Sequence, residues 1–353
     1  MEKKSYIYGK STLSLIEGDM KAFNELPNDN NTNNLNVDNN NNTNNNQLLN
    51  IEPMLLTTAS VMVAVGQGPY SIAYSTDGGI NWTGVNRSNS IFSTGNKVAF
   101  NGSRWVAVGE GDYSIAYSDD GVNWTGVENS KSIFYYGYGI LWAGSYWIGV
   151  GNYGANIAYS TDGITWEKSN INPFEGGYGN AMYSDGNRWV LVGAGNGNTI
   201  AYTSDNSATW NYGTNQFYMR GHDVKWNGSI WVSVGNDLNR FNIKYSEDGK
   251  TWENASNQFI SEGLQVSWNG SRWVAVGYDD SFNIKYSDDG KTWVNPTSNP
   301  FNEKGIGITW NGSRWVAVGQ GTTNTIVYSD DNGMTWNPAT NSRSIFSIAR
   351  GII

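Results

Sequence analysis

The nine residues NGSRWVAVG occur three times in identical form, at residues 101–109, 269–277 and 311–319. A catalytic motif is normally needed once, whereas a motif that is copied along the chain indicates an architecture assembled from copies. Less exact copies of the same strand extend the pattern, with VMVAVG, YWIGVG, RWVLVG and IWVSVG at residues 61–66, 146–151, 188–193 and 230–235. The sequence therefore predicts a repeat protein.

Each copy is followed by a glycine-rich loop, a second short strand of the type NIKYS, and a tight turn that ends in tryptophan, as in STDGGINW at residues 75–82. Large apolar residues alternate within these short runs, which is the period of a strand. Four short antiparallel strands in each repeat are typical of a β-propeller blade. We therefore expect an all-β fold, a seven-bladed β-propeller of four-stranded antiparallel blades. The seven aspartates at the centre of the turns lie 41 to 43 residues apart and are Asp77, Asp120, Asp162, Asp205, Asp248, Asp289 and Asp331.

The two ends of the repeat region predict how the ring closes. The first blade has a weak pattern for its first strand, while the C-terminal SIFSIARGII (344–353) aligns with SIFYYGYGIL (132–141), which leads into the innermost strand of another blade. We therefore expect residues 348–353 to supply the innermost strand of the first blade, a Velcro closure that removes an open sheet edge. Local supply by PMLLT (53–57) is the alternative.

The pattern S-x-D-x-G-x-x-W resembles the Asp box, or BNR repeat, over residues from about 58 to 353. The resemblance implies that Ser and Asp hold the turn between the third and fourth strands and that Trp fills the blade edge. Proteins with this repeat include sialidases and other glycoside hydrolases, sortilin-type receptors and a photosystem II assembly factor. With its regular repeats and its asparagine-rich segment, this chain also resembles uncharacterised repeat propellers of giant viruses. The resemblance implies the sialidase-like fold and leaves the function open.

Composition divides the chain into two parts and excludes several classes of function. Asparagine dominates residues 28–46, so residues 1–50 are predicted to be a largely disordered tail and residues 51–353 the propeller. The 353-residue chain has a formal charge of −9, no basic run and no cysteine. Nucleic acid is therefore not an expected partner, and disulfides and thiol chemistry are excluded. The sequence shows no motif for a metal or cofactor. It also shows no signal peptide or membrane span, which makes a cytoplasmic or particle-associated location the default expectation.

Residues that interrupt the repeat on the face opposite the Asp boxes are the candidate ligand site. They lie in YMRGHDVKW (218–226), NDLNRFN (236–242) and YDDSFN (278–283). At the positions that match His222 and Asp223, other blades have Leu264–Gln265, Ile306–Gly307 and Tyr138–Gly139. Nearby tyrosines are suited to stacking on sugar rings. The predicted ligand-binding residues are Arg220, His222, Asp223, Asp237, Arg240, Asp279 and Asp280.

Two functions fit the repeat pattern. A glycoside hydrolase of sialidase-like type would need three arginines that hold a carboxylate. Residues 1–86 contain no arginine, and four of the nine arginines, Arg104, Arg188, Arg272 and Arg314, lie in the NGSR-type turns on the face of the Asp boxes, opposite the expected ligand face. A non-catalytic binding or assembly scaffold fits near-identical blades better, because a catalytic site needs individually different residues. We therefore expect a scaffold without catalytic residues, which presents one face to a protein or a glycan. The oligomeric state is left open.

Overall fold

A computed structural model describes residues 61–154, 156–204 and 209–353. The predicted asparagine-rich tail and Asp205 lie outside the described residues. Strands form almost all of the regular structure. The exceptions among the described residues are three single turns of helix, η1 (Ser88–Ser90), α2 (Ser130–Ile133) and α3 (Ser342–Ile345). The prediction of an all-β chain is therefore confirmed.

Each repeat folds into a small antiparallel sheet whose strands pair in chain order. In one repeat, β4 (Thr94–Phe100) pairs with β5 (Trp105–Glu110), β5 with β6 (Ile115–Ser118), and β6 with β7 (Thr125–Gly126). Three further sheets have the same order. Their strands are β8 (Tyr136–Trp142), β9 (Trp147–Asn152), β10 (Ile157–Ser160) and β11 (Glu167–Lys168); β12 (Tyr178–Ser184), β13 (Arg188–Ala194), β14 (Ile200–Ser204) and β15 (Asn211–Tyr212); and β16 (Arg220–Trp226), β17 (Trp231–Asn236), β18 (Ile243–Ser246) and β19 (Glu253–Asn254).

A fifth sheet has three strands, β20 (Glu262–Trp268), β21 (Trp273–Tyr278) and β22 (Ile284–Ser287). Its outer segment pairs with β22 through the isolated backbone bridge between Tyr286 and Val294. In the previous sheet, the N–H of Ala255 donates to the carbonyl of Ile243. Pro296 occupies the position of Ala255 and has no N–H to donate. The fourth strand therefore does not form here.

The remaining strands form one eight-stranded sheet. It contains β23 (Lys304–Trp310), β24 (Trp315–Gln320), β25 (Ile326–Ser329) and β26 (Asn337–Pro338), together with β27 (Ile348–Ile352), β1 (Met62–Gln67), β2 (Ile72–Ser75) and β3 (Thr83–Gly84). The single pair Gln320–Ile348 joins the two groups. The prediction of four-stranded antiparallel blades is therefore confirmed in four of the sheets. The predicted number of seven blades is wrong for the described residues, which form five separate sheets and this merged one.

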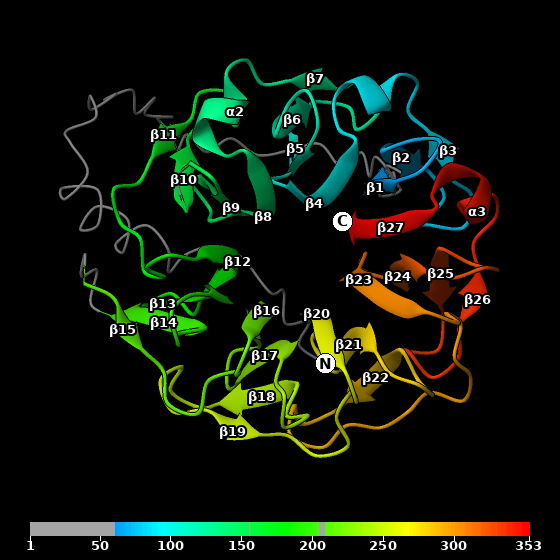
Figure 1. Cartoon of the computed structure of the whole chain (residues 1–353). Coiled ribbons are helices and arrows are strands. Elements are labelled where there is room, and N and C mark those ends of the chain that lie inside the picture. Colours follow the sequence, from blue (N-terminus) through cyan, green and yellow to red (C-terminus); the bar gives the residue numbers. More distant parts are fainter. Residues whose placement is uncertain (1–60, 155, 205–208) are drawn as a thin grey trace, which may run out of the picture.

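The sheets are arranged around a central opening with their first strands innermost (Figure 1). The C-terminal strand β27 pairs antiparallel with β1, from Gln67–Ile348 to Ala64–Ile352. It also contacts β23 and β4, the inner strands on either side of it. Segments from the two ends of the described chain are thus hydrogen bonded to each other.

The hydrophobic core lies between neighbouring sheets rather than inside any one of them. One cluster, for example, combines Val232 and Val234 of β17 with Val266 of β20 and Trp273 of β21. Trp273 is fully buried, as are the tryptophans at the same position of several other repeats. Burial of such large side chains between sheets is the main stabilising contribution expected in this fold.

The aspartate turns are held by side-chain hydrogen bonds to their own backbone. Ser118 Oγ donates to Asp120 Oδ1 at 3.0 Å, and the N–H groups of Val122 and Asn123 donate to the same oxygen at 2.8 and 2.7 Å. The turns at Asp77, Asp162, Asp248, Asp289 and Asp331 repeat this arrangement. These carboxylates are therefore used for local structure.

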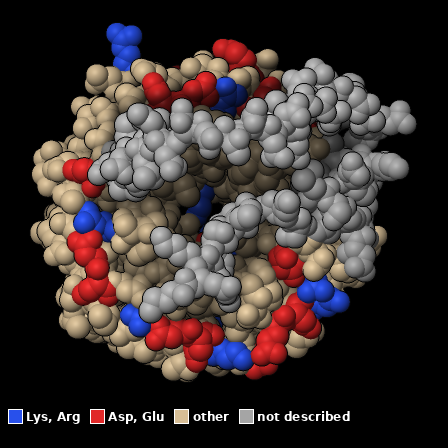
Figure 2. All heavy atoms as spheres, turned by 180° about the vertical axis from the view of Figure 1, so that it is seen from behind, with Lys and Arg blue, Asp and Glu red and all other residues tan. Residues whose placement is uncertain are grey.

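The aspartate that precedes some of these turns has a different partner. Asp119 pairs with Arg104 of the NGSR turn, with Nε 2.7 Å from Oδ1. Asp288 with Arg272 and Asp330 with Arg314 form the same pair in two other repeats. The recurring arginine and the doubled aspartate are thus parts of one repeated surface ion pair. Seen from behind, Asp and Glu form groups around the rim and basic side chains are visible in the central opening (Figure 2).

Candidate functional site: the central channel and the loop face

The innermost strand of each repeat in the described part of the chain carries a β-bulge at the same position. The extra residue of each bulge supplies a side chain to the central channel. In β16 the register shifts between Gly221 and Asp223, so His222 is the extra residue. A Cβ on Gly221 would lie 2.6 Å from the Cβ of Val192 on the neighbouring sheet, so glycine allows the close approach. Bulges commonly redirect a side chain toward a functional site. The equivalent residues are Asn96, Tyr138, Asn180, Leu264, Ile306 and Arg350.

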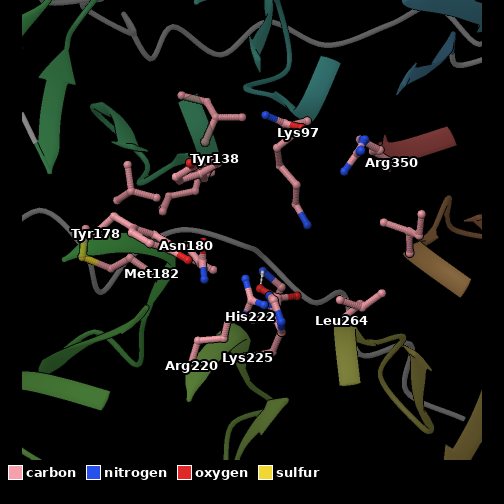
Figure 3. Close-up of a pocket in the computed structure, with 18 residues that line it drawn as sticks. Lys97, Tyr138, Tyr178, Asn180, Met182, Arg220, His222, Lys225, Leu264 and Arg350 are labelled. Atoms are coloured by element: carbon pink, nitrogen blue, oxygen red, sulfur yellow. Dashed lines mark ion pairs between the residues drawn. The ribbon is translucent and has the colours of Figure 1, made fainter. Parts of the chain in front are cut away.

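These bulge residues all line one cavity of about 310 Å³ in the channel. The volume is at the lower end of the range for small-molecule sites. Figure 3 shows Lys97 and Arg350 projecting into the cavity from β4 and β27, with His222 and Lys225 of β16 on another side. Tyr138 and Tyr178 form part of the wall from β8 and β12, with their ring centroids 5.1 Å apart. The cavity thus has a charged side and an aromatic side.

Asp223 is the buried carboxylate of this cavity, with 1% of its surface exposed. Its Oδ2 accepts a hydrogen bond from the N–H of Val266 at 3.2 Å, which links β16 to β20. Its Oδ1 lies 3.8 Å from Lys225 Nζ and has no hydrogen-bond partner among the described residues. Asp223 therefore has a structural role on one oxygen and an unsatisfied acceptor on the other.

The cations around Asp223 outnumber it. Burial lowers the pKa of Lys97 to about 8; nearby Asp223 raises it and Lys225 lowers it further. Burial also lowers the pKa of Arg350, and the nearby carboxylate of Glu110 acts against this shift. The Nε of Arg350 is buried and has no hydrogen-bond partner in the described part of the chain. Positive charge in the channel is therefore only partly compensated by protein groups.

His222 and Arg220 extend this group toward one mouth of the channel. His222 Nε2 lies 3.4 Å from Glu262 Oε2, which is within ion-pair distance but outside hydrogen-bond geometry. The contact with His222 lowers the pKa of Glu262, and the nearby Lys304 and Arg220 act in the same direction. Arg220, His222 and Asp223, which the sequence predicted as site residues, are thus brought together in the cavity wall.

The other predicted site residues do not line this cavity. Asp237 Oδ2 lies 3.4 Å from Nζ of the fully buried Lys244, and its Oδ1 accepts from the N–H of Asn239. Asp279 and Lys285 form the same buried pair at 3.6 Å in the next repeat. Both aspartates are therefore internal ion-pair partners. Arg240 and Asp280 are exposed beside them.

We call the end of the sheets opposite the aspartate turns the loop face. It carries the loops between second and third strands and the segments that enter the inner strands, because antiparallel pairing places these at one end. Most of the exposed large apolar side chains lie there: Tyr135, Tyr153, Tyr218, Met219, Leu238, Phe241, Ile260 and Tyr278.

Tyr153 is the most exposed of these side chains, at 74%. Its φ of 53° is in the left-handed region, which costs a bulky residue energy. Its ring lies 5.7 Å from that of Tyr136, and Tyr136 lies 6.4 Å from Tyr138 in the cavity wall. A line of tyrosines therefore runs from the loop face into the channel.

No family model and no curated protein matches this chain. Solved structures do match. YCF48 bound to D1 peptide has 15% identity and a TM-score of 0.52, over 71% of this chain and 83% of that one. A 6-phosphogluconolactonase candidate from Bacteroides uniformis has 9% identity and a TM-score of 0.57, over 83% and 98%. The chain folds as a β-propeller. A GH74 enzyme from Niastella koreensis has 13% identity and a TM-score of 0.49, over 81% and 65%. At these identities the comparisons give the propeller fold alone.

Sequence reasoning missed half of the charged site. Lys97, Lys225 and Arg350 were not predicted, although Lys97 matches Asp223 in the repeat alignment and Arg350 matches His222. Extending the comparison of His222 and Asp223 to every repeat of the propeller would have found both. In the described ranges, no group of three or more His, Asp or Glu is placed to hold a metal ion. No helix there is long and apolar enough to cross a membrane.

Proposed function

We propose that this propeller is a non-catalytic binding scaffold that presents its loop face to a partner. The observation that carries the proposal is the gathering of exposed tyrosine, phenylalanine, methionine and leucine side chains on that face. Exposed apolar side chains that gather on one face mark interaction sites, and aromatic residues and methionine are enriched in interfaces. The partner we favour is a protein, because Met219, Leu238 and Ile260 add aliphatic surface that sugar rings do not require.

Two structural details belong to the same proposal. We infer that the serine–aspartate turns are Asp boxes, which is supported by the shared hydrogen bonds of Ser118 and Asp120 and of their equivalents. We also infer that β27 acts as a Velcro strand that closes the ring, which is supported by its pairing with β1. A closed ring would hold the loops of the loop face in fixed positions. Such a preorganised surface loses less entropy on binding.

The hydrolase alternative lacks an observation that favours it. Asp223, which lines the cavity, already faces Lys225, and Glu262 beside the cavity already faces His222. YCF48, which shares the fold, has been solved bound to a peptide, and this gives a precedent for the scaffold and no more.

The experiment uses the full chain as bait against an extract of its source cells and, in parallel, against a glycan array. The test variant is Tyr218→Ser/Leu238→Ser, which removes two highly exposed apolar side chains from the loop face. The matched control is Ile164→Ser/Met334→Ser, which changes exposed apolar residues at the aspartate turns. We expect a protein partner that the test variant loses and the control retains. Equal capture by both variants would contradict the proposal, and a glycan hit with the same dependence would replace the protein partner by a sugar.

A further inference from the structure

We propose that the central channel binds a small oxyanion, a phosphate or sulfate group, between Lys97, Arg350 and Lys225. The first argument is charge. These three cations line one cavity, and the buried carboxylate among its lining residues is Asp223. A buried charge without a partner is costly, so a site with surplus positive charge favours an anion that enters it. This inference concerns the channel and does not depend on a partner at the loop face.

The second argument is the pattern of unsatisfied atoms. Among the described residues that line this cavity, Arg350 Nε, His222 Nε2 and Asp223 Oδ1 are buried without hydrogen-bond partners. His222 Nε2 faces Glu262 and Asp223 Oδ1 faces Lys225 at ion-pair distance, so Arg350 Nε is the one of the three without a charged partner in such reach. Buried polar atoms normally have partners, so each exception needs an explanation such as an absent ion or water. An oxyanion accepts hydrogen bonds on several oxygens and can satisfy a guanidinium and an ammonium at once.

The third argument is the shape of the cavity. Its volume of about 310 Å³ is larger than an inorganic ion needs and leaves room for an organic group. Tyr138 and Tyr178 form the aromatic side, across the cavity from Arg350 in Figure 3. An aryl or sugar phosphate would place its charge on the cations and its ring on the tyrosines. The same oxyanion chemistry therefore fits a free ion or a phosphorylated small molecule.

The test measures binding of inorganic phosphate, inorganic sulfate and phenyl phosphate to the full chain by isothermal titration at pH 7. Lys97 is charged at this pH because its pKa is about 8. We expect saturable binding that Lys97→Met weakens about ten-fold or more, because a charge-assisted hydrogen bond is lost. Lys168→Met is the matched control, since Lys168 is exposed on β11. Tighter binding of phenyl phosphate than of inorganic phosphate would assign the site to an organic phosphate. Equal binding of the two would assign the site to the free ion.

A second variant is expected to bind more tightly, a result that a misfolded protein could not give. Asp223→Asn removes the buried negative charge and keeps an oxygen that can accept from Val266 N–H. We expect it to bind phosphate several-fold more tightly than the unchanged protein. No binding of any of the three probes, unchanged affinity in Lys97→Met, or weaker binding in Asp223→Asn would each overturn the proposal. Partner capture by the loop face is measured separately, so either proposal can fail alone.

Discussion

Replacing Asp237 by alanine tests whether the loops of the fifth and sixth repeats are structural. Asp237 and Lys244 form an ion pair in which the lysine side chain is fully buried and the aspartate is almost so. Removing the carboxylate leaves the ammonium group in the interior without its charge partner. The variant therefore separates a structural aspartate from one that is free to bind a ligand.

The expected loss follows from what Lys244 keeps. Breaking a buried pair by removing one partner costs about 3–5 kcal/mol. Lys244 Nζ still donates to Asn254 Oδ1 at 2.8 Å and lies 3.4 Å from Asn215 Oδ1, so we expect the lower end, about 3 kcal/mol. Burial already lowers the pKa of Lys244, and Asp237 acts against that shift. The loss should therefore shrink as the pH rises and the lysine becomes neutral.

The assay is urea unfolding of a double-mutant cycle. Lys244→Ala/Asp237→Ala should be within about 1 kcal/mol of the unchanged protein, since the pair is replaced by a neutral interior. Other repeats support this expectation because they have alanine at the position of Lys244, namely Ala73, Ala116, Ala158 and Ala201. Exposed Asp280→Ala is the control and should change stability by less than about 0.5 kcal/mol. A loss below about 1 kcal/mol in Asp237→Ala, or a double variant less stable than it, would refute the reasoning.

Three further predictions test the scaffold. Trp273→Ala should lower the free energy of unfolding by roughly 3–5 kcal/mol, whereas exposed Met334→Ala should have little effect; similar denaturant midpoints would contradict the proposed core. Burial raises the pKa of Asp120, but hydrogen bonds from Asn123, Val122 and Ser118 outweigh it and lower the pKa to about 2 from 3.8. The contribution of the Asp120 carboxylate to stability is thus present above pH 3.8 and lost toward pH 2. In Asp120→Asn, the free energy of unfolding should therefore depend less on pH between pH 3.8 and pH 2. An unchanged acid transition, followed by circular dichroism, would count against this. Deleting residues 347–353 removes β27 and should abolish cooperative melting or solubility, and a truncated chain that melts like the intact one would show that β27 is dispensable.

The repeat and its turns could be predicted from sequence because their causes are local. Asp120 reaches backbone groups two and three residues away, so the residues that define the turn are contiguous. The division into sheets could not be predicted in the same way. It depends on the missing N–H of Pro296 and on the single pair Gln320–Ile348, and the second of these joins segments of different repeats.

Sequence comparison identified only those residues of the cavity wall that lie together on one strand. Arg220, His222 and Asp223 lie together on β16 and stand out from the repeat. Lys97 and Arg350 come from β4 and β27 and meet them only across the channel, which a linear comparison does not reveal. The buried ion pairs of Asp237 and Asp279 were not predicted, because nothing in the strands that carry Lys244 and Lys285 marks these lysines as their partners.

The β-bulge of the inner strands has a consequence for how this chain can change. The bulge residue lies outside the ladder pairing of its own sheet. At two of the bulges, Asn96 and Asn180 also donate from Nδ2 to the carbonyls of Gly137 and Gly221 on the next inner strand. A mutation there alters the lining of the channel and leaves the tryptophan and valine packing between sheets untouched. The protein already carries asparagine, tyrosine, histidine, leucine, isoleucine and arginine at these positions on nearly identical backbones. Evolution or a protein engineer can therefore exchange these side chains one at a time, and new specificity can arise in the channel without a new fold.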